Sequence, residues 1–139
     1  MSRLLILIVL TATAMCGCGV GVNNLTRLKS ADLSVGDRVL LQSDAVIYEC
    51  DPADTASAFW FGSGNKKHCL KSKDDITQYD GKHMGTVPSG TSAVVSKLKF
   101  INGVDTTYHL AYLRVSGVDG ELVVYGFHFP KLLNLPDVR

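Results

Sequence analysis

Two cysteines and two histidines in the middle of the chain are the residues best suited to chemistry. Cys50, His68, Cys69 and His83 could hold a metal ion, or one cysteine could act as a nucleophile activated by a histidine. Known metal sites usually place two ligands two to four residues apart, twice over, and the adjacent His68 and Cys69 do not fit that spacing. Neither cysteine lies in a motif typical of a catalytic thiol, so we expect no metal site and no catalytic residue here.

Acidic residues offer the second kind of chemistry. A pair of carboxylates that cleaves a glycan must lie about 5–9 Å apart, but most acidic residues here fall in expected loops, where they serve solubility. Asp74, Asp75 and Asp80 lack the alternating spacing of a calcium-binding loop. Gly62-Ser63-Gly64 lacks the lysine and serine that follow a phosphate-binding glycine loop. We therefore expect a protein that is not an enzyme and that holds no cofactor.

The N-terminal segment, residues 1–17, has the layout of a secretory signal peptide. Arg3 precedes the apolar run 4–10, and small residues follow before a cysteine. This run is too short to cross a bilayer as a permanent helix, which needs about 20 residues. The layout therefore predicts export.

The end of this segment resembles the signals of bacterial lipoproteins, in which a four-residue box ends in the lipidated cysteine. Met15-Cys16-Gly17-Cys18 fits that box and implies lipidation of Cys18, whereas a box ending at Cys16 places the bulky Met15 where a small residue is expected. The next residue is Gly19 rather than an aspartate. By the same resemblance, this implies an anchor in the outer membrane facing the periplasm, with a soluble periplasmic protein as the alternative.

Export also bears on the pair Cys50 and Cys69. In an oxidising compartment two thiols in one small domain usually form a disulfide, which we expect here, with free thiols as the alternative. The bridge would close a loop of about 20 residues and contribute roughly 3 kcal/mol of stability on the chain-entropy model.

Composition bounds the remaining possibilities. The 139 residues carry 14 basic and 13 acidic side chains, and removal of the signal removes only the charge of Arg3. A balance so near neutrality gives no reason to expect nucleic acid or a polybasic membrane patch as partner. We expect a tether over residues 18–30 and one domain over residues 31–139, ending in a C-terminal tail.

Short strands separated by turn signals dominate that domain. In residues 92–100, Val94, Leu98 and Phe100 share one face and Lys97 and Lys99 the other, which is the two-residue period of a half-buried strand. Asn102-Gly103 and Val118-Asp119-Gly120 predict hairpins that join this strand to strands at 107–115 and 121–129. Further strands are expected at 39–41, 45–48 and 58–61, and one helical turn at 131–134. The pattern predicts an all-β fold, a small antiparallel barrel of five or six strands.

Three segments together resemble bacterial Src-homology-3-like domains. They are Leu33-Ser34-Val35-Gly36-Asp37-Arg38-Val39, Thr86-Val87-Pro88-Ser89-Gly90-Thr91 and the meander over residues 92–129. The resemblance implies a barrel in which the last strand returns to the first. It also implies binding of cell-wall peptides or proteins through an aromatic groove.

Aromatic residues are the candidates for partner binding. Phe59-Trp60-Phe61 places three large rings in succession, so in a strand at least one must face away from the core. The rings are either covered on both sides or form an exposed platform, since Trp and Tyr are favoured at interfaces. Tyr108 and Tyr112 share one face of a strand as core or as groove, with His109 on the other face.

Together these patterns predict a non-enzymatic, lipid-anchored envelope protein. Its β-domain would act as a binding or structural module for an envelope protein or for peptidoglycan. The alternative is a periplasmic inhibitor or immunity protein that blocks a cell-wall hydrolase, with the loop at residues 62–67 as the candidate inhibitory segment.

Overall fold

The computed structural model describes residues 21–55, 66–103 and 106–135. Its strands are β1 (Gly21–Leu25), β2 (Arg27–Leu28), β3 (Leu33–Ser34), β4 (Arg38–Leu40), β5 (Ala45–Cys50), β6 (Lys67–Ser72), β7 (His83–Val87), β8 (Ser92–Asn102), β9 (Thr107–Val115) and β10 (Leu122–Tyr125). Its helices are short: η2 (Lys29–Ala31), η3 (Lys73–Asp75), η4 (Gly126–His128) and α3 (Phe129–Leu132). The all-β character predicted from the sequence is confirmed.

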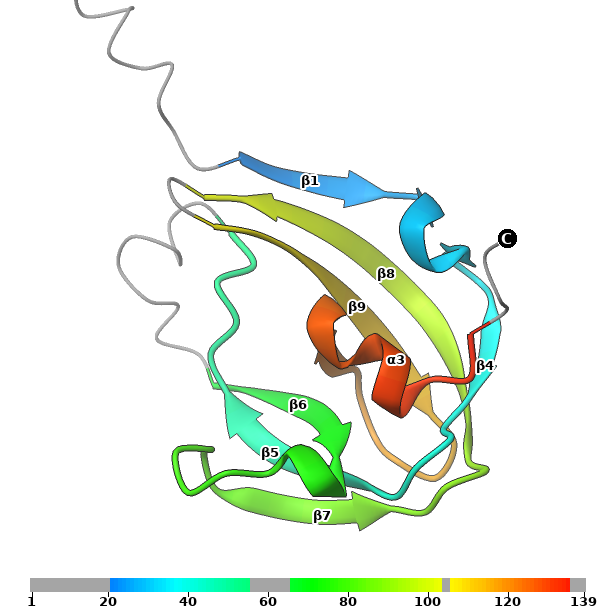
Figure 1. The fold of residues 1–139 in the computed structure, drawn as a ribbon, viewed down its shortest axis with the longest axis vertical. Helices are drawn as coiled ribbons and strands as arrows, with labels where there is room; N and C mark the ends of the chain where they lie inside the picture. The colour runs from blue at the N-terminus through cyan, green and yellow to red at the C-terminus, as the bar shows by residue number, and fades with distance from the viewer. Residues whose placement is uncertain (1–20, 56–65, 104–105, 136–139) are drawn as a thin grey trace, which may run out of the picture.

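One sheet of eight strands organises the molecule, in the order β1-β8-β9-β10-β6-β5-β7, with β4 also paired to β8. The sheet curves around α3, which lies in its hollow (Figure 1). All neighbouring strands run antiparallel except β10 and β6, where Val123 faces Cys69 in a parallel pair. β2 and β3 form a separate two-stranded sheet.

The predicted closed barrel of five or six strands is wrong. The sheet is open and mixed, with β1 and β7 at its two ends. The last strand of the meander, β10, pairs with β6 instead of returning to the first strand. From Cys69 to Ser72, β6 is covered on both faces, with Cys69 and Leu70 fully buried, as strands in parallel pairing usually are. The sequence does not indicate this burial, because β6 also contains Lys67, His68 and Lys71.

The N-terminal boundary also differs from the expected tether over residues 18–30. Gly21–Leu25 forms strand β1, which pairs antiparallel with β8 from Gly21 opposite Asn102 to Leu25 opposite Leu98. Within the described residues, the folded domain therefore begins at Gly21, ten residues earlier than the sequence predicts.

The C-terminal end of the meander is shorter than predicted. β10 ends at Tyr125, and the chain turns through η4 into α3, so Phe129 leaves the face that Val123 and Tyr125 share. Phe129 and Leu132 then pack into the hollow of the sheet, and Leu133 forms a β-bridge with Leu41. The predicted helical turn thus exists, two residues earlier than expected.

The sheet separates two hydrophobic cores. The inner core lies on the side of α3 and consists of Leu28, Leu33, Val39, Leu41, Ala45, Ile47, Leu70, Val87, Ala93, Val95, Leu98, Ala111, Leu113, Val115, Leu122, Val124, Phe129, Leu132 and Leu133. The outer core lies on the opposite face and consists of Tyr48, Cys69, Ile101, Leu110, Tyr112 and Val123. The half-buried Val22, Cys50, Tyr108 and Tyr125 pack against this outer core.

A β-bulge at Ser96 sets the faces of β8. The register with β9 shifts between Val95 and Lys97, so one extra residue lies in β8 there. Val95 therefore shares the inner face with Leu98, and Val94 is exposed, contrary to the predicted alternation. Beyond the bulge the prediction is right: Lys97 and Lys99 lie opposite the face of Leu98. The bulge thereby places Lys97 directly across from Tyr112.

Candidate functional site

The outer face carries a disulfide at its centre. Cys50 at the end of β5 and Cys69 in β6 are bonded, with Cα atoms 5.8 Å apart, and the predicted pairing is confirmed. Cys69 is fully buried, and it stands opposite Tyr48 on β5 and Val123 on β10. The bond ties together the two strand ends from which the connection between β5 and β6 departs.

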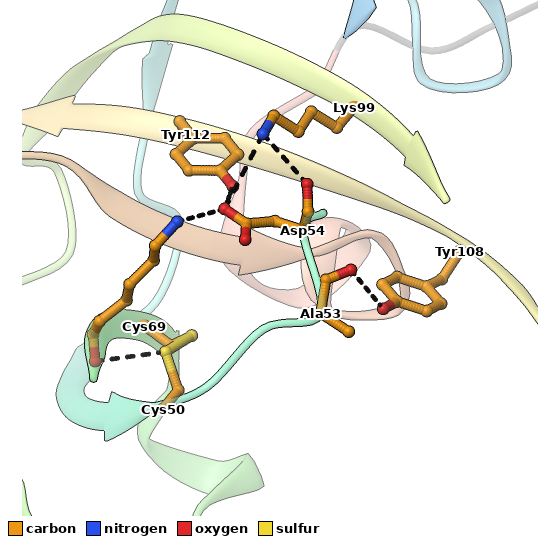
Figure 2. A network of polar contacts seen from close by, with 8 residues as sticks. Cys50, Ala53, Asp54, Cys69, Lys99, Tyr108 and Tyr112 are labelled. Atoms are coloured by element: carbon orange, nitrogen blue, oxygen red, sulfur yellow. Dashed lines mark hydrogen bonds and ion pairs between the residues drawn. A yellow bond between two sulfur atoms is a disulfide. The ribbon is translucent and has the colours of Figure 1, made fainter. Parts of the chain in front are cut away.

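The first residues of that connection, 51–55, form a strap across the outer face. Its anchor is Asp54, whose side chain is buried and receives hydrogen bonds from Lys67 Nζ and Tyr112 Oη. Lys99 Nζ lies 3.8 Å from the same carboxylate and donates to the Asp54 carbonyl at 3.2 Å. Tyr108 Oη donates to the Ala53 carbonyl at 3.1 Å, so three strands hold the strap (Figure 2).

Charge complementarity explains how a carboxylate tolerates this burial. Burial alone would raise the pKa of Asp54, but the hydrogen bonds from Lys67 and Tyr112 and the charges of Lys67 and Lys99 hold it below its ordinary value. Conversely, burial together with the hydrogen bond and charge of Asp54 raises the pKa of Tyr112 far above its usual range. At neutral pH the group is therefore an aspartate bound by a neutral tyrosine and two ammonium groups.

Beside the strap lies a cavity that we call the lysine–tyrosine pocket. It has a volume of about 260 Å³ and is lined by Lys67, His68, Lys97, Tyr112, Glu121 and Val123. Its floor follows one cross-strand row, because Lys97 faces Tyr112 and Tyr112 faces Val123 in register. The floor is therefore built on β8, β9 and β10, not on loops.

Three ammonium groups gather over a single ring in this pocket. The Nζ atoms of Lys67, Lys97 and Lys99 lie 5.7, 5.5 and 5.4 Å from the centroid of the Tyr112 ring. These distances are within the range of cation–π attraction. On the far wall, the Glu121 carboxylate accepts a hydrogen bond from Ser96 Oγ at 2.9 Å.

A second cavity of about 260 Å³ adjoins the same lysine. Its lining combines polar and apolar side chains from β1, β8 and the turn before β4, namely Asn24, Leu25, Val35, Ser96, Lys97, Leu98 and Lys99. It lies where β4 and β1 leave the same edge of β8, since β4 pairs with residues up to Val94 and β1 pairs from Leu98 onward. Lys97 lines both cavities.

A separate polar group fastens the other end of the outer face. Lys71, which is only 5% exposed, donates to Asp80 and lies 4.9 Å from the centroid of the Tyr48 ring. Asp75 accepts a hydrogen bond from Lys131 at 2.7 Å and lies 3.4 Å from His128 Nδ1. These contacts fix η3 and the segment after it against the sheet and against the C-terminal helices.

The predicted site residues fall into two groups. Tyr108 and Tyr112 lie on the outer face as anchors of the strap, Tyr108 half-buried and Tyr112 buried. Phe59, Trp60, Phe61 and Cys18 lie outside the described residues. His109 points to the other face, with its ring centroid 5.1 Å from that of Phe100.

The charged partners of these tyrosines cannot be recognised as a group in the sequence. Asp54 stands in an acidic loop, and Lys67 in a charged stretch without clear period. Among these charged partners, only Lys97 and Lys99 could be placed together from the sequence, since the alternation of β8 puts them on one face.

In the described ranges, no three His, Cys, Asp or Glu side chains gather closely enough to hold a metal ion. Nor does any helix in those ranges have the length and apolar character needed to span a membrane.

Comparisons with known proteins add no relative. No protein-family model matches the chain, and searches of curated proteins and of solved structures likewise returned no match.

Proposed function

We propose that the chain is an exported, non-enzymatic binding module, anchored by a lipid on Cys18 to the outer membrane and facing the periplasm. The observation that carries this proposal is the disulfide-tied strap on the outer face. Its partner is a protein or peptidoglycan of the cell envelope.

Export is supported by the bond between Cys50 and Cys69. Structural disulfides form and persist in oxidising compartments, and Cys69 has its sulfur in the centre of the outer core. The signal-like residues 1–17 agree with this, and the Cys18 box accounts for the anchor.

A binding role is supported by the way the outer face is built. The strap is held on rigid strands by Tyr108, Tyr112 and two lysines, and an open cavity lies next to it. Binding surfaces whose side chains are fixed by packing and hydrogen bonds lose little entropy when a partner docks.

Intact mass of the membrane-extracted protein tests export and anchoring. We expect a mature chain that begins at Cys18 and carries acyl mass, and a gain of about 2 Da on reduction as the disulfide opens. A Cys18→Ala variant serves as control and should lose the acyl mass. A soluble chain without lipid would contradict the anchor, and unchanged mass on reduction would contradict the bridge.

Crosslinking in intact cells tests the binding role. We expect the wild-type protein to form a specific adduct with an envelope protein or with peptidoglycan. The adduct should be lost when Tyr108→Ala and Asp54→Asn are combined to release the strap. A Lys29→Gln variant on the exposed η2 is the control and should retain the adduct.

A further inference from the structure

The lysine–tyrosine pocket has more positive than negative charge around its floor. Asp54 is shared between Lys67 and Lys99, while Lys97 makes no ion pair with any described carboxylate. Glu121, the other carboxylate at the pocket, accepts a hydrogen bond from Ser96 and keeps its negative charge, so three lysine ammonium groups face two carboxylates. Lys97 is exposed and lines both cavities. The three N–H donors of its ammonium group can therefore turn toward either one.

The floor of the pocket is shaped for a small group. A volume of about 260 Å³ lies below the range of 300–1,000 Å³ of most drug-sized ligand sites, so it suits one side chain of a partner. Tyr112 has its hydroxyl bound to Asp54, which leaves the ring and Val123 as the apolar floor. A ligand here meets an apolar surface below and ammonium groups at the side.

The second cavity lies next to the pocket and could hold the residue that follows or precedes the bound side chain in a partner polypeptide. It shares Lys97 with the pocket, and its lining is mixed, with polar Asn24 and Ser96 beside Leu25 and Val35. A polypeptide that placed an acidic side chain in the first cavity would bring its neighbouring residue toward this mixed lining.

We propose that the two cavities bind an acidic segment of a partner protein, with Lys97 pairing a carboxylate over the Tyr112 ring and the adjoining cavity taking the residue beside it. This inference rests on the proposed binding function and names the chemistry of the partner. Charge-assisted hydrogen bonds to carboxylates are among the stronger polar contacts of interfaces, and Lys97 supplies one without breaking an existing ion pair.

The test is a titration of isotope-labelled protein followed by the backbone amide signals. The probe is the capped dipeptide N-acetyl-Glu-Leu-amide, its matched control is N-acetyl-Gln-Leu-amide, and inorganic phosphate is a third arm. We expect saturable shifts at Ser96, Tyr112 and Val123 with the glutamate probe only. A response to the glutamine probe of equal size would overturn the proposal, as would no saturable shift, or saturation by phosphate without the glutamate probe.

Variants then locate the contact. Lys97→Gln should weaken binding of the glutamate probe by about tenfold, since it removes one charge-assisted hydrogen bond. Lys97→Arg should retain binding, and Lys29→Gln, a charge change on η2, should leave it unchanged. All three variants should stay folded: Lys97 is exposed and makes no ion pair with a described residue, so Lys97→Gln should cost no more stability than its exposed cation–π contact with Tyr112 supplies. Equal loss in Lys97→Gln and Lys29→Gln would assign the effect to net charge and overturn the proposal.

The crosslinking experiment separates this proposal from the binding function itself. If Lys97→Gln still captured the same partner in cells, the function would stand and the assignment of the pocket would fall. If the probe bound as expected but the wild-type protein captured no partner, the pocket would stand and the proposed function would fall.

Discussion

Different kinds of interaction stabilise the two faces of the sheet. The inner core is made entirely of apolar side chains, closed by the chain's own α3. The outer core has six buried residues, and a disulfide, two tyrosine hydroxyls, three lysines and a buried aspartate complete it. Apolar burial is insensitive to pH and redox state, whereas ion pairs respond to pH and disulfides respond to redox state. The stability of the inner face should therefore be constant over a wide range of conditions, whereas that of the outer face should depend on pH and on the redox state.

The largest effect is expected from the inner core. Leu132→Ala removes a fully buried side chain from α3 and should lower the free energy of unfolding by about 2–5 kcal/mol, because it leaves a cavity in close-packed surroundings. Denaturant unfolding measures the loss. Leu40→Ala, a change of the same kind at an exposed position on β4, is the control and should cost far less. Equal losses would contradict the assignment of α3 to the core.

Opening the disulfide should affect the outer face next. Reduction of the wild-type protein frees Cys50 from Cys69 and should cost about 3 kcal/mol, since the unfolded chain regains the entropy of the closed loop. Paired denaturant curves of oxidised and reduced protein measure this. In amide exchange, the strap should lose protection and α3 should keep it; uniform loss over both faces would show that the two faces unfold as one.

Removing the charge of Asp54 should lower the free energy of unfolding by less than opening the disulfide does. Asp54→Asn leaves Lys67 and Lys99 without their carboxylate and should lower the free energy of unfolding by about 1–3 kcal/mol, reduced because both lysines keep contact with water. Asp119→Asn, in an exposed turn, is the matched control and should change little. If the two substitutions cost the same, the buried ion pairs contribute nothing net.

The smallest expected effect is the pH dependence of the stability that Asp54→Asn loses. The pKa of Asp54 is lower in the folded protein than in the unfolded chain, so its contribution is complete above the unfolded value, near pH 4, and is lost as the pH falls through the folded value. The gap between wild type and Asp54→Asn should therefore narrow in acid below about pH 4. Asp75 and Asp80 have pKa values lowered in the same direction, so both proteins should also lose stability in acid. A gap that stays constant down to pH 2 would exclude the ion pairs as its origin.

The parts of the fold that were predictable are those with a local signal. The meander of β8, β9 and β10 follows from alternation and from two glycine turns, and the turn before β4 follows from its residues. There Gly36 has φ of +94°, and the Asp37 carboxylate accepts a hydrogen bond from the Ser34 amide at 2.8 Å. Each of these signals lies within a few residues of the structure it specifies.

The parts that failed depend on long-range partners. β1 reads as a polar linker because Asn23 and Asn24 are exposed on an edge strand. The sequence of β6 has no clear strand pattern, because its buried Lys71 depends on contacts with Asp80 and Tyr48. The same holds for the candidate site: Tyr108 and Tyr112 were identified, whereas Asp54 becomes part of it only through side chains 13 to 58 residues away. Periodicity does not encode such pairings.

The short parallel seam between β6 and β10 also has a consequence for how the chain assembles. On one side of the seam, β5, β6 and β7 are neighbours in sequence; on the other, so are β8, β9 and β10. The pairings within β5–β7 and within β8–β10 are local, whereas the seam joins Cys69 to Val123, and β1 and β4 join β8, across long stretches of chain, and such closures are slow. Cys69 is a member of both the seam and the disulfide, so the bond to Cys50 fastens one side of the seam to β5 and shortens the chain that the closure must order.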